Sequence, residues 1–235
     1  MPLTDKIAVI TGATGQLGPV VARVFASHGA RVALTATHAE ELAAMVQKLG
    51  LPNSRLFSSP RDLVDERAAV EFADAVVERF GRADILLHLV NAYQSSALYG
   101  LVTKDWDEMM NLNLRTGLNV MRAFLPFMAT NNWGRIITLS SPLADKPNSQ
   151  SAAFSAAKAG LEALTMAVAQ EVRDKAVTAN VIVVKMIDTQ EARVAAGGRS
   201  PGAASPEEIA NLMIYLCSEE AAAVNGARLP IYGRG

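Results

Sequence analysis

The sequence predicts a single doubly wound α/β domain, in which a parallel sheet of about seven strands is covered by helices on both faces. Short β-branched runs alternate with longer helical patterns from one end of the chain to the other. The short runs are apolar throughout rather than alternating, which is typical of parallel strands buried on both faces. No linker-like stretch and no internal repeat divides the 235 residues, so we expect one domain over residues 1–235.

Each expected strand is a short apolar run. These runs lie at residues 7–10, 32–34, 55–57, 85–90, 136–139, 181–184 and 229–232, and the third is the weakest. Between them, apolar residues recur with a period of 3.6, which indicates amphipathic helices. Long helices are expected over residues 105–128 and 151–172. Another helix is expected to start at Ser205, a good cap ahead of Pro206 and two glutamates.

Composition excludes several classes of function. Lys and Arg total 22 against 23 Asp and Glu, so the chain lacks the basic excess that a nucleic acid partner requires. No apolar stretch approaches the roughly 18 residues of a membrane-spanning helix, and the first residues do not resemble a signal peptide. The single cysteine, Cys217, cannot form an internal disulfide, and the three histidines are too scattered for a metal site. We expect a cytoplasmic protein with a small-molecule substrate and no metal, membrane or nucleic acid partner.

A glycine-rich turn follows the first expected strand. Residues 11–18 read Thr-Gly-Ala-Thr-Gly-Gln-Leu-Gly, and a helical pattern comes directly after them. Glycines let the backbone turn sharply and approach phosphates, while the amides and dipole at the helix N-terminus attract negative charge. The turn therefore predicts a dinucleotide site, although its spacing is G-x-x-G-x-x-G rather than G-x-G-x-x-G. The expected contacts are Gly12, Thr14, Gly15, Gln16, Leu17 and Gly18.

The end of the second expected strand bears on the type of dinucleotide. An acidic residue there would bind the ribose diol of NAD. The residues are instead Thr35, Ala36, Thr37 and His38, with neither a carboxylate nor an arginine. We expect Thr35, Thr37 and His38 beside the cofactor, and a hydrogen bond from Thr37 or His38 to a 2′-phosphate gives NADP a slight preference over NAD. The alternative for His38 is a solvated residue in the first turn of a helix.

With these features, the chain resembles the short-chain dehydrogenase/reductase family over essentially its whole length. The matching positions, in order, are residues 11–18, 62–63, 113, 141, 158, 187–189 and 225–233. The resemblance implies a Rossmann fold that binds NAD or NADP and acts on a carbonyl or alcohol substrate. It implies that Asp62 and Leu63 contact the adenine and that Ile187 and Thr189 contact the carboxamide and phosphates. It also implies that long helices pair across a two-fold axis, giving a homodimer or homotetramer.

The family's catalytic residues match this chain at all but one position. In the family, a serine polarises the substrate carbonyl, a tyrosine thirteen residues later exchanges the proton, and a lysine four residues beyond holds the nicotinamide ribose and lowers the pKa of the tyrosine. Ser141 matches the serine and Lys158 the lysine, while Asn113 matches an asparagine that completes a water relay. The position of the tyrosine is occupied by Phe154, thirteen residues after Ser141 and four before Lys158. Phe154 is either the natural residue or a laboratory substitution of a tyrosine. The resemblance therefore implies an oxidoreductase of reduced activity, or alternatively a non-catalytic dinucleotide-binding sensor or scaffold.

The segment after the fourth expected strand also departs from the family's pattern. The family motif N-N-A-G appears as residues 88–91 or, with a shift, as residues 91–93. Asn91 and Ala92 are expected near the cofactor. His88 lies inside an apolar run, where a hydrogen-bonded core residue is expected rather than an acid.

The substrate cleft is the least specified region. Tyr93 and Tyr99 follow the fourth expected strand, and either is a candidate to replace the missing phenol. Ser151 and Ser155 flank Phe154, but a hydroxyl without an adjacent base is a poor acid. Residues 195–204, rich in Gly, Ala and Pro, are expected to form either a lid over a ligand or an ordinary surface loop.

Overall fold

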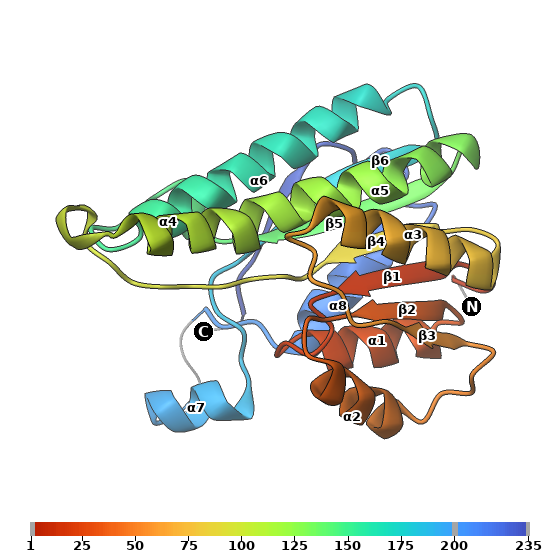
Figure 1. Ribbon diagram of the computed structural model, residues 1–235, viewed down its shortest axis with the longest axis horizontal. Coiled ribbons are helices and arrows are strands. Elements are labelled where there is room, and N and C mark those ends of the chain that lie inside the picture. The colour runs from red at the N-terminus through yellow and green to blue at the C-terminus, as the bar shows by residue number, and fades with distance from the viewer. Residues whose placement is uncertain (1–2, 199–201, 234–235) are drawn as a thin grey trace.

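The computed structural model describes residues 3–198 and 202–233 and confirms the predicted fold class. A seven-stranded sheet has the order β3-β2-β1-β4-β5-β6-β7, and all neighbouring strands are parallel. The strands are β1 (Ile7–Thr11), β2 (Arg31–Thr35), β3 (Leu56–Ser58), β4 (Ile85–His88), β5 (Gly134–Ser140), β6 (Val177–Val184) and β7 (Arg228–Ile231). Helices cover both faces of this sheet (Figure 1). The architecture is that of a Rossmann-type domain.

The helices form two layers. They are α1 (Gly18–Ser27), α2 (Ala39–Leu49), α3 (Glu66–Phe80), α4 (Thr103–Met110), α5 (Thr116–Thr130), α6 (Ala152–Glu171), α7 (Gln190–Ala196) and α8 (Pro206–Leu216). α1, α2 and α8 pack on one face of the sheet, and α3, α5 and α6 pack on the other. Figure 1 shows α7 standing apart from both layers. Ser205 caps α8 with a complete capping box, as predicted.

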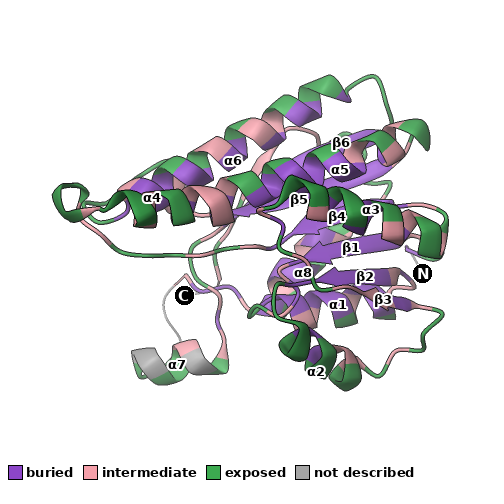
Figure 2. Cartoon of the chain, in the orientation of Figure 1, coloured by how far each residue is buried: buried purple, intermediate pink, exposed green. Residues whose placement is uncertain are grey.

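The hydrophobic core is divided by the sheet. Successive residues of a strand point to opposite faces, so Val9 joins the cluster with Phe72 and Phe124, whereas Ile10 joins the cluster with Phe25. The five inner strands are almost entirely buried, the edge strands β3 and β7 are only partly buried, and the outer faces of the helices are exposed (Figure 2). Burial on both faces accounts for the continuous apolar runs of the sequence.

Two elements differ from the prediction. The expected helix over residues 105–128 is interrupted by a π-helical segment, η2 (Asn111–Arg115), which joins α4 to α5. Such a segment widens one turn and frequently lies at a functional site. The short helix α7 was not predicted. It takes up the first residues of the expected loop 195–204, of which residues 199–201 lie outside the described residues, while Ala204 pairs with Ile187.

One described helix, α6, is long and apolar enough to cross a membrane by length and composition alone. It contains Lys158, Glu162 and Glu171, and its inner residues, such as Leu161, are buried against the sheet. This arrangement is that of a core helix in a folded domain.

Candidate active site

The glycine-rich turn lies between β1 and α1, at the carboxyl edge of the sheet where the strand order reverses. In open α/β sheets, ligands bind in the crevice at this reversal. Gly12 has a φ of +66°, and a Cβ there would lie 3.0 Å from the backbone nitrogen of Val90. A Cβ on Gly18 would overlap the carbonyl oxygen of Ala13. The backbone packing therefore requires both glycines, whereas Gly15 is exposed and open to a ligand.

A cleft of about 580 Å³ opens beside this turn. Residues from the ends of four strands and from α6 line it: Gly12, Gly15, Gln16, Leu17, Gly18, Leu89, Asn91, Tyr93, Leu139, Ser140, Ser141, Leu143, Phe154, Val184, Lys185, Met186 and Ile187. One continuous space therefore joins the glycine turn to Ser141 and Phe154, whereas Asn113 and Lys158 do not line it. Among the described residues, no group of three or more His, Cys, Asp or Glu side chains is placed to hold a metal ion.

A smaller cavity of about 130 Å³ adjoins the turn on its other side and also touches Gly12. It is lined by Gly12, Thr14, Ala36, Thr37, His38, Arg61, Asp62, Leu63, Val90, Leu112 and Thr116. Besides Gly12, which lines both cavities, five predicted cofactor contacts therefore lie together here. They are Thr14, Thr37, His38, Asp62 and Leu63. Arg61 was missed, although its position directly before Asp62 places it near the carboxyl end of β3, beside β2.

Thr35 does not line either of these two cavities. Its side chain is fully buried, and its Oγ1 has no hydrogen-bond partner within the described chain. Its carbonyl oxygen instead accepts a hydrogen bond of 3.0 Å from the backbone nitrogen of Ala13. Thr35 thus ties the glycine turn to β2, and the expected direct contact of its side chain with a cofactor has no support in the geometry.

His88 is a buried residue at the end of β4. Its Nδ1 lies 2.8 Å from Oγ1 of Thr11, and its Nε2 lies 3.3 Å from Oγ1 of Thr116. Burial, with a smaller effect of the nearby Lys158 charge, lowers the pKa of His88 to about 3. The ring is therefore neutral near pH 7 and links β1, β4 and α5 as a hydrogen-bonded core residue, as the sequence analysis expected.

Asn113 occupies the π-helical segment and is fully buried. Its Nδ2 donates to the carbonyl oxygens of Ala92 (2.9 Å) and Met109 (3.1 Å), and its Oδ1 accepts from the nitrogen of Ala92 (3.1 Å). The side-chain amide of Asn113 therefore binds both the N–H and the C=O group of Ala92 and holds the segment after β4 in place. Asn113 does not line the cleft, and both of its Nδ2 protons are used in these bonds.

Two adjacent hydroxyls lie at the carboxyl end of β5. Oγ of Ser141 accepts a hydrogen bond of 3.3 Å from the nitrogen of Leu143, which leaves its own proton for donation into the cleft. Ser140, which the sequence analysis missed, also lines the cleft, and its buried Oγ has no partner in the part of the chain that the structure describes. The cleft thus presents the Ser141 hydroxyl beside an apolar wall, whereas the Oγ of Ser140 is buried behind the cleft surface.

That wall is formed by two aromatic rings. Phe154, in the first turn of α6, is buried and meets Tyr93 edge to face. Tyr93 is half exposed and lines the cleft, whereas Tyr99 is 98% exposed and does not line it. Of the two tyrosines considered as replacements for the phenol, the structure brings only Tyr93 to Phe154.

Lys158 is buried behind this wall. Its Nζ donates a hydrogen bond of 3.2 Å to the carbonyl oxygen of Leu139 and lies 5.8 Å from the centre of the Phe154 ring. Burial lowers the pKa of Lys158 to about 7, although the negative charge of Glu162 acts in the opposite direction. Glu162 itself accepts a hydrogen bond of 2.8 Å from Nε of Arg228. The spacing of Ser141, Phe154 and Lys158 along the chain therefore corresponds to proximity in space. Ser141 and Phe154 line the same cleft, and Lys158 lies next to Phe154.

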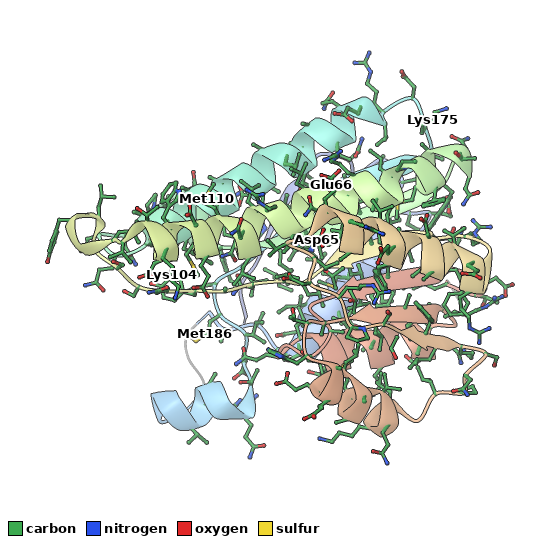
Figure 3. The ribbon with its side chains drawn as sticks, in the orientation of Figure 1. Asp65, Glu66, Lys104, Met110, Lys175 and Met186 are labelled. Atoms are coloured by element: carbon green, nitrogen blue, oxygen red, sulfur yellow. The ribbon has the colours of Figure 1, made fainter. Side chains whose placement is uncertain are left out.

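The chain after β6 forms the outer rim of the cleft. Ile187 lines the cleft, and Met186, labelled in Figure 3, lies where the chain leaves the body towards α7. Thr189 does not line it, because its Oγ1 caps α7 by accepting a hydrogen bond of 3.1 Å from the nitrogen of Ala192. Nε of Arg193 donates to the buried Asp188 at 2.7 Å, which fixes the start of α7. The hydroxyl of Thr189 thus caps α7 as an acceptor, and its expected contact with a phosphate stays a prediction.

The comparisons agree with this geometry. Residues 6–197 match the family model described as short chain dehydrogenase. The chain is 30% identical over 245 residues to the 3-oxoacyl-(acyl-carrier-protein) reductase FabG of Escherichia coli, covering 99% of this chain and 98% of that protein. It is 30% identical over 241 residues to D-threitol dehydrogenase of Mycolicibacterium smegmatis, covering 98% and 93%.

Solved structures also resemble this one. An apo short-chain oxidoreductase from Pseudomonas aeruginosa, described as containing an atypical catalytic center, superposes with a TM-score of 0.90 at 26% identity over 98% of this chain and 97% of that one. A mutant short-chain dehydrogenase/reductase from Serratia marcescens gives a TM-score of 0.87 at 26% identity, with 98% of both chains covered.

Proposed function

Because the chain belongs to the short-chain dehydrogenase/reductase family, whose members bind NAD or NADP, we propose that it is a slow oxidoreductase of a small carbonyl or alcohol substrate. The observation that carries this proposal is the single cleft that runs from the glycine turn to Ser141 and Phe154. When bound, the cofactor would supply or take up the hydride. The remaining chemistry is the task of the protein's own side chains.

The residues present fit a dinucleotide. Gly12 and Gly18 are positions where a Cβ would strike the backbone, and Gly15 leaves the turn open towards the cleft. Amide groups at the start of α1 favour a pyrophosphate there. The smaller cavity would hold the adenosine between the ends of β2 and β3, with Asp62 and Leu63 at the adenine. Asn91 and Ile187, which line the large cleft, would lie near the nicotinamide.

Ser141 would polarise the substrate. Hydride transfer to a carbonyl carbon builds negative charge on the oxygen, which a preorganised donor stabilises. The Ser141 hydroxyl lines the cleft, and its oxygen is held by the amide of Leu143, so its proton is directed to another acceptor. In this proposal that acceptor is the substrate oxygen.

Protonation of the alkoxide is the slow step of the proposed reaction. Phe154 has no hydroxyl, so the alkoxide would take its proton from water rather than from a positioned acid. Loss of a general acid typically reduces the rate about 10²–10⁴-fold, which is compatible with slow turnover. Lys158, buried behind Phe154, would hold the nicotinamide ribose, and with a pKa of about 7 it would be partly protonated near the missing hydroxyl at neutral pH.

The cleft lining favours an apolar substrate. Around the two serines it presents Tyr93, Leu143, Phe154 and Met186. A ketone or secondary alcohol with apolar substituents would fill this surface and leave only its oxygen to Ser141.

We also propose a homodimer or homotetramer in the reducing cytoplasm. The exposed positions of α6 include Ala156, Ala159, Ala163 and Ala167, which would let a second copy approach closely. Light scattering is the test, and a monomeric mass contradicts this part of the proposal.

The second candidate is a non-catalytic dinucleotide-binding protein, and the buried phenyl ring of Phe154 favours it. Calorimetry with NADH and NADPH, followed by cofactor oxidation with a panel of ketones, separates the two. The oxidoreductase proposal expects micromolar or tighter binding with slow turnover that falls in Ser141→Ala. Tight binding with no turnover of any ketone supports the second candidate, and no binding of either cofactor contradicts both.

A further inference from the structure

Arg61 holds an unusual place in the smaller cavity. It lies between β3 and α3, and its backbone nitrogen donates a hydrogen bond of 3.0 Å to the carbonyl oxygen of Ala36, just past the end of β2. Its side chain lines the cavity together with Thr37 and His38. The segment after β3 therefore brings a cation to the place where the sequence after β2 offers only neutral polar side chains or a histidine.

The guanidinium of Arg61 is incompletely satisfied. One terminal nitrogen, Nη1, donates to the carbonyl oxygen of Pro60 at 3.0 Å. Nε is buried and has no hydrogen-bond partner among the described residues. A charged group is costly to leave incompletely paired, so the place of Arg61 in the cavity lining indicates an anionic ligand for the rest of the guanidinium.

The surroundings select an anionic ligand. Asp62 is the acidic residue in the cavity lining, and its Oδ1 accepts a hydrogen bond of 3.0 Å from the nitrogen of Val64 in its own turn. The end of β2 carries no carboxylate of the kind that binds a free ribose diol. A guanidinium with a free edge suits the planar, multidentate recognition of a phosphate.

We propose that Arg61 binds the 2′-phosphate of NADP and makes the protein selective for NADP over NAD. This inference rests on the proposed function, because it requires that the protein binds a dinucleotide. The cation would come from the β3 edge, while Thr37 and His38 would complete the phosphate site from the β2 edge. A competing possibility is that the guanidinium stacks on the adenine, which would strengthen binding of both cofactors equally.

The test is calorimetry on the full chain with NADPH, NADH, adenosine 2′,5′-bisphosphate and AMP. The last two ligands differ only in the 2′-phosphate. Arg61→Ala should weaken NADPH and the bisphosphate about 10- to 100-fold, as loss of a charge-assisted hydrogen bond does, and change NADH and AMP less than about twofold. Arg61→Lys should retain part of the selectivity and controls for folding.

The matched control is Arg67→Ala, which removes the same charge from an exposed side chain paired with Glu71 at 3.0 Å. It should leave the affinities for all four ligands unchanged. Equal affinity of the wild type for NADPH and NADH, or an equal loss of both in Arg61→Ala, overturns the role of Arg61 but not the proposed function. Failure of the wild type to bind either dinucleotide overturns both.

Discussion

The ring of Phe154 meets the ring of Tyr93 edge to face, with the centroids 5.0 Å apart and the planes at 87°. This pair forms an apolar wall at the position where related enzymes are expected to present a phenolic hydroxyl. Ser141 lines the same cleft, and Lys158 lies behind the wall. In the proposed function, Ser141 orients the substrate and Lys158 the cofactor, while a phenylalanine stands where a proton donor is expected.

Restoring the hydroxyl should restore activity. We expect Phe154→Tyr to raise kcat about 10²–10⁴-fold in NADPH oxidation with apolar ketones, because it returns a general acid beside the Lys158 cation. The control is Tyr93→Phe in the wild type. If Tyr93 already serves as the acid, its loss abolishes the remaining turnover and the gain from Phe154→Tyr is small. Zero turnover in Phe154→Tyr means that the missing phenol is not the only defect.

Lys158 should make stability depend on pH above neutrality. Its pKa is lowered from 10.5 to about 7 by burial, so between these values the unfolded chain binds a proton that the folded chain does not. The free energy of unfolding therefore rises with pH in this window. We expect Lys158→Met to stabilise the protein more at pH 6 than at pH 9, by on the order of 2 kcal/mol in urea denaturation.

The control for this experiment is Lys175→Met, which removes an exposed lysine from the turn before β6 (Figure 3). It should show nearly the same effect at the two pH values. An equal effect of Lys158→Met at pH 6 and pH 9 would mean that Lys158 is charged and well compensated in the folded protein.

His88 should make the protein sensitive to acid. Its pKa is lowered from 6.5 to about 3 because the ring is buried, so the unfolded state takes up a proton first as the pH falls. Stability present above pH 6.5 should then be lost progressively towards pH 3, by on the order of 3 kcal/mol between pH 6.5 and 4. His88→Asn keeps a polar partner for Thr11 and should flatten this dependence. The exposed His38→Asn should not, and equal slopes in the two variants would contradict the assignment.

Substitutions at two glycines of the turn should have different effects, one on stability and the other on cofactor binding. A Cβ on Gly18 overlaps the backbone of Ala13, so Gly18→Ala should lower the free energy of unfolding by about 3 kcal/mol or more, as strong overpacking does. A Cβ on Gly15 meets only the carbonyl oxygen of Gly12, at 3.3 Å. Gly15→Ala should therefore unfold nearly like the wild type but bind NADPH at least about tenfold more weakly, because the methyl group enters the phosphate cradle. Unchanged affinity in Gly15→Ala would place the pyrophosphate elsewhere.

Short sequence patterns predicted much of the fold. The apolar runs predicted the buried parallel strands, and the capped start at Ser205 predicted α8. The interruption of the expected helix over residues 105–128 was not predictable from period alone, because it depends on Asn113 binding Ala92, a residue 21 positions away. The short helix α7 was missed because seven residues give too little periodicity, and its cap at Thr189 had been assigned to the cofactor.

The amino-acid sequence by itself determined the parallel sheet, the glycine-rich turn and the spacing of Ser141, Phe154 and Lys158, because each depends on residues close together along the chain. Only the tertiary structure decided which side chains reach the cavities. It brought Arg61, Ser140 and Tyr93 to the lining of the two cavities, and it left Thr35 and Thr189 outside that lining. The reason is that the direction of a side chain at a strand end is set by neighbouring strands and helices that lie far away in the sequence.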